Sequence, residues 1–181
     1  MSRILSSVIL LLLASTVTVS GQSKKPAEAE RILKAAIQKA DSTNKNVFLI
    51  FHASWCGWCK RLDAALEDPA LKDLMEENYI ITRLDVLESN EKMQTLENPG
   101  GKKIMNSLGG EKSGLPFYAF LDAKGKKIAD SNVMPKNQNI GYPGSPEEIS
   151  AFESLLKKTA PRLTGGQLAT IVAFLQKNMP R

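Results

Sequence analysis

Two cysteines, Cys56 and Cys59, are the only ones in the 181-residue chain, and they stand three positions apart. They follow a short apolar run of strand formers, Val47–Phe51, and precede a stretch with apolar residues at helical spacing. A cysteine between a strand and a helix faces unpaired backbone N–H groups and the positive end of the helix dipole. We therefore expect the pKa of the Cys56 thiol to be lowered, which suits Cys56 to attack a disulfide as a thiolate. Cys59, one helical turn further on, could then resolve the mixed disulfide.

The cysteine pair allows two other interpretations. A structural bridge between residues three apart constrains the unfolded chain by only about 2 kcal/mol in the loop-entropy model, and a domain of this size does not depend on it. Half of a tetrahedral zinc site would need further N, S or O ligands, but His52 is the single histidine and there is no third cysteine. The spacing therefore favours redox chemistry, with no metal and no other bound cofactor.

The elements that must position the cysteines begin with an alternating pattern. Apolar residues predict a helix over 29–40, a strand follows over 47–51, helical spacing resumes after the cysteines, and residues 79–86 predict a second strand. An N-cap aspartate followed by proline predicts a further helix over 68–75. Strand, helix and strand in this order indicate a βαβ unit with parallel strands.

The second half of the chain predicts a hairpin and two helices. A third strand over 117–121 returns through a tight turn as an antiparallel strand over 126–129. A capping box predicts a helix over 145–158, and a weaker repeat of the same signal opens a terminal helix over 164–177. Residues 88–114 are the least readable part of the chain. Residues 99–101 predict a break and residues 102–108 one or two helical turns, and we assign no function to this segment.

The N-terminus differs from the rest of the chain. Arg3, an apolar run and the small residues before position 22 are typical of an export signal over residues 1–21. Serines and threonines interrupt the apolar run, so its uninterrupted length is shorter than the roughly 20 residues that a membrane span needs. We therefore expect cleavage of the signal and no stable membrane anchor. One domain over 26–160 and a helical extension over 161–181 would then remain. The net charge of +5 is scattered, which argues against a nucleic-acid partner.

Two motifs resemble the thioredoxin superfamily. The first follows the buried strand and reads Trp55-Cys56-Gly57-Trp58-Cys59-Lys60. The second, Gly114–Gly125, resembles the family's stretch in which a cis-proline opens the strand beside the active site. The resemblance covers about residues 30–160. It implies the α/β thioredoxin fold, a central mixed β-sheet flanked by helices, with the N-terminal signal segment and an extra C-terminal helix outside it.

The resemblance also implies the residues of the site. Cys56 and Cys59 would be catalytic and would form the disulfide, with Pro116 in the cis form against it. The substrate groove would be formed by Trp55, Gly57, Trp58, Leu115 and Pro116. The backbone of Leu115 would be free to pair with a substrate strand.

The remaining residues near the cysteines allow more than one interpretation. We expect Trp58 to be exposed and Trp55 to have a mixed packing role, although either ring could belong to the core. Residues 141–144 could form a third wall of the groove or an ordinary surface loop. Lys60 could tune the nucleophile or project into water, and His52 could tune it or be a satisfied histidine beside the sheet.

Two departures from the family pattern affect the chemistry. Ile50 stands where thioredoxin carries a buried acid that assists proton transfer from the resolving cysteine, so water or another group must serve here. Trp58 replaces the proline of thioredoxin and the histidine of the strongly oxidising relatives. Since tryptophan cannot stabilise a thiolate by charge, Trp58 argues against an extreme oxidant.

The resemblance therefore predicts an enzyme, a thiol-disulfide oxidoreductase in the periplasm or outside the cell. It would reduce disulfides of exported proteins and receive electrons from a membrane thiol-disulfide donor. The same residues could serve a disulfide oxidase or isomerase, because about 30 mV corresponds to only 1.4 kcal/mol. A non-catalytic client-binding module with the same fold is a further alternative.

Overall fold

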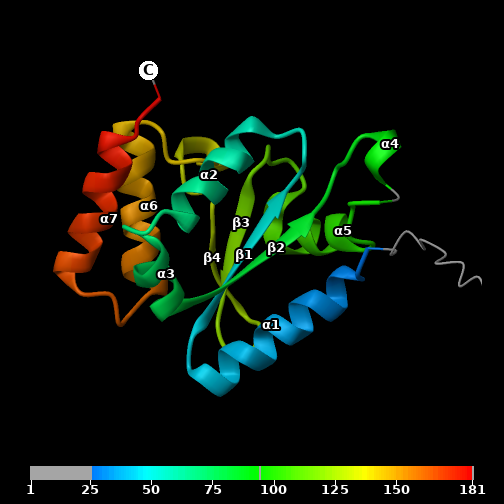
Figure 1. Cartoon of the computed structure of the whole chain (residues 1–181), viewed down its shortest axis with the longest axis horizontal. Coiled ribbons are helices and arrows are strands. Elements are labelled where there is room, and N and C mark those ends of the chain that lie inside the picture. The colour runs from blue at the N-terminus through cyan, green and yellow to red at the C-terminus, as the bar shows by residue number, and fades with distance from the viewer. Residues whose placement is uncertain (1–25, 94, 181) are drawn as a thin grey trace, which may run out of the picture.

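The centre of the fold is a four-stranded mixed sheet with the strand order β2-β1-β3-β4 (Figure 1). The computed structural model describes residues 26–93 and 95–180, so the predicted export signal lies outside the described residues. The strands are β1 (Asn46–His52), β2 (Tyr79–Asp85), β3 (Phe117–Leu121) and β4 (Lys127–Asp130). β1 pairs in parallel with β2 and antiparallel with β3, and β3 pairs antiparallel with β4. The predicted mixed sheet, its parallel pair and its antiparallel hairpin are confirmed.

Helices cover both faces of the sheet. They are α1 (Ala29–Thr43), α2 (Gly57–Glu67), α3 (Lys72–Asn78), α4 (Asn90–Met93), α5 (Gly101–Met105), α6 (Pro146–Thr159) and α7 (Gly165–Lys177), with the short π-helical turn η1 (Asn106–Gly110) and the 3-10 turn η2 (Pro135–Asn137). α1 and α5 pack on one face, while α2, α3 and α6 pack on the other, with α7 beside α6 (Figure 1).

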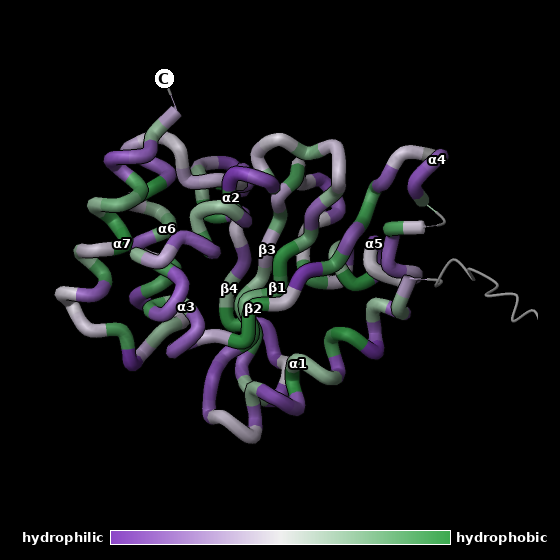
Figure 2. The backbone as a smooth tube through the Cα atoms, viewed as in Figure 1, coloured by the Kyte–Doolittle hydropathy of each residue, from purple (hydrophilic) through white to green (hydrophobic). Residues whose placement is uncertain are grey.

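The strand residues alternate between two hydrophobic cores. Phe48 and Ile50 of β1 contribute to the core under α2 and α6, whereas Val47, Leu49 and Phe51 contribute to the core under α1. Both faces of β1 are therefore buried, which explains the continuous apolar run in its sequence. Figure 2 shows hydrophobic residues along the central strands and hydrophilic residues in the outer loops.

One predicted helix begins later than expected. The carboxylate of Asp68 accepts a hydrogen bond from the backbone N–H of Ala70 at 2.9 Å, and the Asp68 carbonyl accepts from Lys72 at 2.9 Å. These bonds close a separate turn over residues 69–71, and the regular helix α3 starts only at Lys72 and runs to Asn78. Asp68 therefore caps a turn, and the predicted helix over 68–75 was wrong in both bounds.

The two C-terminal helices begin as predicted. Ser145 and Thr164 each accept from a backbone N–H three residues on, and the side chains of Glu148 and Gln167 complete both capping boxes. Ile171 and other apolar residues of α7 belong to the same core as α6, so the extra C-terminal helix is packed on the domain. None of the helices in the described part of the chain has the length and apolarity needed to cross a membrane.

Candidate disulfide active site

The two cysteines lie at the junction between β1 and α2, where they form a disulfide. Cys56 is the N-cap of α2, and its Cα atom lies 5.2 Å from that of Cys59. The backbone N–H of Cys59 donates to the Cys56 sulfur across 3.1 Å. This sulfur is therefore the group that satisfies an otherwise unpaired N–H in the first turn of the helix. The predicted Cys56–Cys59 disulfide is confirmed.

Leu115, whose side chain packs against the cysteines, is followed directly by Pro116. The peptide bond between them is cis, as predicted. The side chain of Leu115 packs on a small buried cluster of Ala53, Cys56 and Cys59. Neither the backbone N–H nor the carbonyl of Leu115 hydrogen-bonds to any of the described residues. A short length of unpaired backbone therefore lies beside the sulfur atoms.

Trp58 and Tyr142 form a stacked pair next to the cysteines. Trp58 is 50% exposed, which confirms its predicted exposure, and its ring lies 6.1 Å from that of Tyr142 at an interplanar angle of 16°. The Arg61 guanidinium lies 5.9 Å from the Trp58 ring centroid and 5.5 Å from that of Tyr142. Residues 141–144 thus lie beside the site, as the groove-wall interpretation requires.

Trp55 is partly exposed and anchored by one hydrogen bond. Its side chain is 58% exposed, and its indole N–H donates to the carbonyl of Leu87 at 2.8 Å. The indole N–H is therefore anchored while more than half of the residue is exposed, and the mixed packing role of the ring stays a prediction. Gly57 and Lys60 are both exposed.

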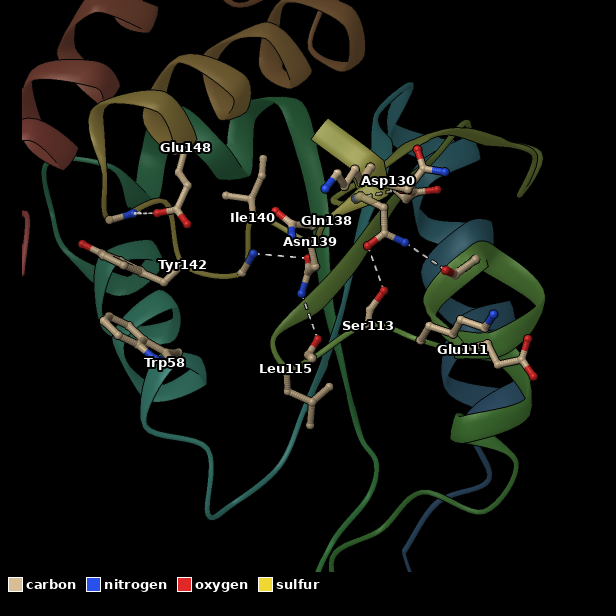
Figure 3. A pocket seen from close by; sticks show the side chains of 18 of the residues that line it. Trp58, Glu111, Ser113, Leu115, Asp130, Gln138, Asn139, Ile140, Tyr142 and Glu148 are labelled. Atoms are coloured by element: carbon tan, nitrogen blue, oxygen red, sulfur yellow. Dashed lines mark hydrogen bonds between the residues drawn. The ribbon is translucent and has the colours of Figure 1, made fainter. Parts of the chain in front are cut away.

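A polar groove with a volume of about 1230 Å³ begins at Trp58 and Leu115 (Figure 3). Its walls come from the segment before β3 and from the segment between β4 and α6. Figure 3 shows Asn139 reaching from the second segment to the first. Glu148 also lines the groove, and its carboxylate accepts from the backbone N–H groups of Gly144 and Ser145. The groove therefore extends the surface beside the disulfide across two separate loops.

His52 lies between two carboxylates. Its Nδ1 is 3.2 Å from Asp63 of α2, and its Nε2 is 3.3 Å from Asp85 of β2. Burial opposes ionisation of Asp63, but hydrogen bonds from His52 and from Arg83, at 2.5 Å, outweigh it and lower the pKa of that carboxyl. Burial raises the pKa of Asp85. Each ring nitrogen of His52 thus lies near a carboxylate oxygen, as expected for a histidine with polar partners beside the sheet. A role of His52 in tuning the nucleophile stays a prediction.

The sequence analysis missed two positions that shape the site. Glu88 is only 5% exposed and accepts from both the backbone N–H and the hydroxyl of Ser54, at 2.5 and 2.8 Å, so it fixes the loop that leads to Cys56. Asn139 bonds to the segment around Leu115. A carboxylate two residues after a predicted strand was an available signal for Glu88, whereas no sequence pattern distinguishes Asn139.

Comparisons with known proteins agree with this geometry. The model of the thioredoxin-like family matches residues 28–123, which is more than half of the chain. The protein disulfide-isomerase tigA of Aspergillus niger is 28% identical over 151 residues, which cover 83% of this chain and 36% of the relative. The thiol:disulfide interchange protein DsbD of Photorhabdus laumondii is 30% identical over 93 residues, which cover 51% of this chain and 14% of the relative. The chain therefore spans little more than a third, or less, of these curated relatives.

A solved structure supports the fold. A disulphide isomerase from Xylella fastidiosa aligns with a TM-score of 0.50 at 18% identity, over 91% of this chain and 98% of the other. Together with the family match, this likeness confirms the predicted thioredoxin fold. The relatives and the cysteine pair support thiol-disulfide oxidoreductase activity.

Proposed function

The chain belongs to the thioredoxin-like family, and from this premise we propose that it exchanges disulfides with polypeptide clients through Cys56 and Cys59. The proposal rests on one hydrogen bond at the start of α2: the backbone N–H of Cys59 donates to the Cys56 sulfur, with 3.1 Å between nitrogen and sulfur. A hydrogen-bond donor and a helix N-terminus both stabilise a thiolate relative to a thiol. We therefore assign the attacking role to Cys56 and the resolving role to Cys59.

The proposed cycle consumes one client disulfide. The reduced Cys56 thiolate attacks a client sulfur, the client S–S bond breaks, and one client thiolate leaves and takes up a proton. Cys59 then loses its proton to water or a neighbouring base and attacks the Cys56 sulfur of the mixed disulfide. The second client thiolate leaves, the Cys56–Cys59 bond closes, and two electrons have passed to the client.

We propose the reductive direction and an extracytoplasmic location. Trp58 supports the reductive direction. A positively charged side chain at this position would stabilise the thiolate of the reduced form and make the protein a stronger oxidant, and tryptophan carries no charge. The pattern of residues 1–21 supports export. Clients would be disulfide-containing exported proteins, and a membrane thiol-disulfide donor would return the electrons to Cys56 and Cys59.

Disulfide isomerisation is the second candidate. The observation that favours it is the likeness to proteins named disulfide-isomerases, including the relative from Aspergillus niger. The reduction potential separates the candidates, since about 30 mV changes the driving force by 1.4 kcal/mol. Equilibration with glutathione buffers of known potential measures it: a potential near that of thioredoxin supports a reductase, and one near that of protein disulfide isomerase supports isomerisation.

Two experiments test the activity itself. Insulin reduction by dithiothreitol should be faster with the full chain present than with Cys56→Ser. Equal rates would contradict catalysis and favour a client-binding module. In the native host, Cys59→Ser should accumulate mixed disulfides through Cys56, and the captured proteins would identify clients and electron donor. Cys56→Ser is the matched control, because it should capture none.

A further inference from the structure

A single side chain, that of Asn139, holds the backbone on both sides of Leu115. Its Nδ2 donates to the carbonyl of Gly114 at 2.8 Å and to the carbonyl of Pro116 at 2.9 Å. Its Oδ1 accepts from the backbone N–H of Gly141 at 3.2 Å. Figure 3 shows Asn139 reaching from its own loop to the segment of Leu115. Both amide hydrogens and one lone pair are thus used to join two loops.

These bonds leave Leu115 in a distinctive state. The carbonyls before and after its own are occupied, whereas its N–H and carbonyl have no hydrogen-bond partner among the described residues. Its side chain is fixed against Cys56 and Cys59. Leu115 therefore offers one donor and one acceptor in a fixed position beside the disulfide, which is what an extended polypeptide needs in order to add to a strand edge.

From this arrangement we propose that Asn139 is a positioning residue that gives the enzyme its preference for disulfides in polypeptides over small disulfides. The inference rests on the proposed thiol-disulfide exchange and goes beyond it. A backbone that is ordered before binding loses no further conformational freedom when a client pairs with it, so affinity for the client rises. A small disulfide has no backbone to pair with Leu115 and gains nothing from the same order.

A second asparagine in the same groove provides a matched control. Asn132 accepts from the Ser113 hydroxyl at 2.8 Å and donates to the carbonyl of Gly109 at 2.9 Å. It thus bridges two segments as Asn139 does, but it does not bond to either carbonyl that flanks Leu115. A general loss of loop order should affect both asparagine variants alike, whereas a role through Leu115 should affect only the variants of Asn139.

The test compares two substrates that carry the same chromophoric leaving group, thionitrobenzoate. One is a decapeptide whose single cysteine forms the mixed disulfide, and the other is cysteamine in the same linkage. Single-turnover rates with excess reduced full-length protein give the half-saturating concentration and the limiting rate separately. Asn139→Ala should lower the ratio of limiting rate to half-saturating concentration about tenfold for the peptide, mostly through weaker binding, as expected for the loss of ordered hydrogen bonds. The cysteamine rate should change less than about twofold.

The other variants decide the interpretation. Asn139→Asp keeps the acceptor for Gly141 but loses both donors, so it should repeat the effect of Asn139→Ala and carries the test if that variant does not fold. Asn132→Ala should leave the peptide-to-cysteamine ratio unchanged. An unchanged ratio in folded Asn139 variants overturns the inference while the exchange activity stands. A wild-type protein that reacts with neither substrate overturns the proposed function and this inference with it.

Discussion

The clearest quantitative prediction concerns the ionisation of Cys56 after the disulfide is reduced. In Cys59→Ser, Cys56 is the only thiol, and the backbone N–H of residue 59 remains to donate to its sulfur, as it does across 3.1 Å in the oxidised protein. Two effects favour the thiolate: the N-terminus of α2 and this hydrogen bond. The opposing effect is burial, since Cys56 is only 4% exposed.

The magnitude follows from these terms. A helix N-terminus stabilises a nearby charge by about 0.3–1 kcal/mol, and about 2 kcal/mol in partly buried geometry. A hydrogen bond to a charged group contributes about 1.5–3 kcal/mol, of which the neutral thiol already has a part. After a deduction for burial, about 1–2 kcal/mol should remain, so the acid ionisation constant of Cys56 should exceed that of a free cysteine about 5- to 30-fold.

Alkylation with iodoacetamide across a pH series measures this effect. Rates are normalised to the plateau at high pH, so limited access to the sulfur does not alter the apparent titration. The same variant in guanidinium chloride provides the free-cysteine reference, and folded Cys56→Ser reports on Cys59, which lies inside the first turn. A folded Cys56 that titrates together with its own unfolded reference would refute the assignment of this sulfur as the nucleophile.

Three further predictions concern stability in urea. The pKa of Asp63 is lowered in the folded state, so its charge stabilises the fold above its unfolded pKa of about 3.9, and this contribution is lost as pH falls through the folded value. Asp63→Asn should therefore cost about 1 kcal/mol at pH 7, and this cost should shrink as the pH falls below about 3.9. Ile171→Ala should cost about 2–5 kcal/mol because Ile171 is fully buried, whereas the exposed Thr170→Ala should stay within about 0.5 kcal/mol. Gly110→Ala should lower the free energy of unfolding by about 1–3 kcal/mol, because the added Cβ would lie 2.6 Å from the ring of Phe117 in β3. Gly166→Ala should cost nothing, because no atom lies within 4 Å of the added Cβ.

Elements with a local signal were predictable from the sequence. The capping boxes at Ser145 and Thr164 depend on side chains three residues apart, so each helix start is encoded within one turn. The continuous apolar run of β1 was equally informative, because both of its faces are buried. The start of α3 was less certain for a physical reason: an aspartate followed by proline caps an isolated turn as well as a helix, and Asp68 does the former.

The supporting contacts of the site were not predictable, because they join segments distant in sequence. Glu88 bonds to Ser54 across 34 positions, and Asn139 bonds to Gly114 across 25. A polar residue in a polar loop looks the same whether it faces water or fixes another loop. The hydrogen bond from the Trp55 indole shows the same limit, since its acceptor is a carbonyl 32 positions away.

Sheet register explains why these distant segments meet at the disulfide. Phe51 pairs with Phe117 in the antiparallel ladder. The chain that leaves β1 toward Cys56 and the chain that enters β3 from Leu115 therefore lie at the same end of the sheet. Because β4 is antiparallel to β3, it ends at this same end of the sheet, and the loop that contains Asn139 begins there. A slip of one residue between β1 and β3 would move Leu115 by about 3.3 Å and turn its side chain away from the sulfurs. The cysteine motif can supply a nucleophile by itself, but the register of β1 with β3 determines whether that nucleophile lies beside a backbone edge that a polypeptide could bind.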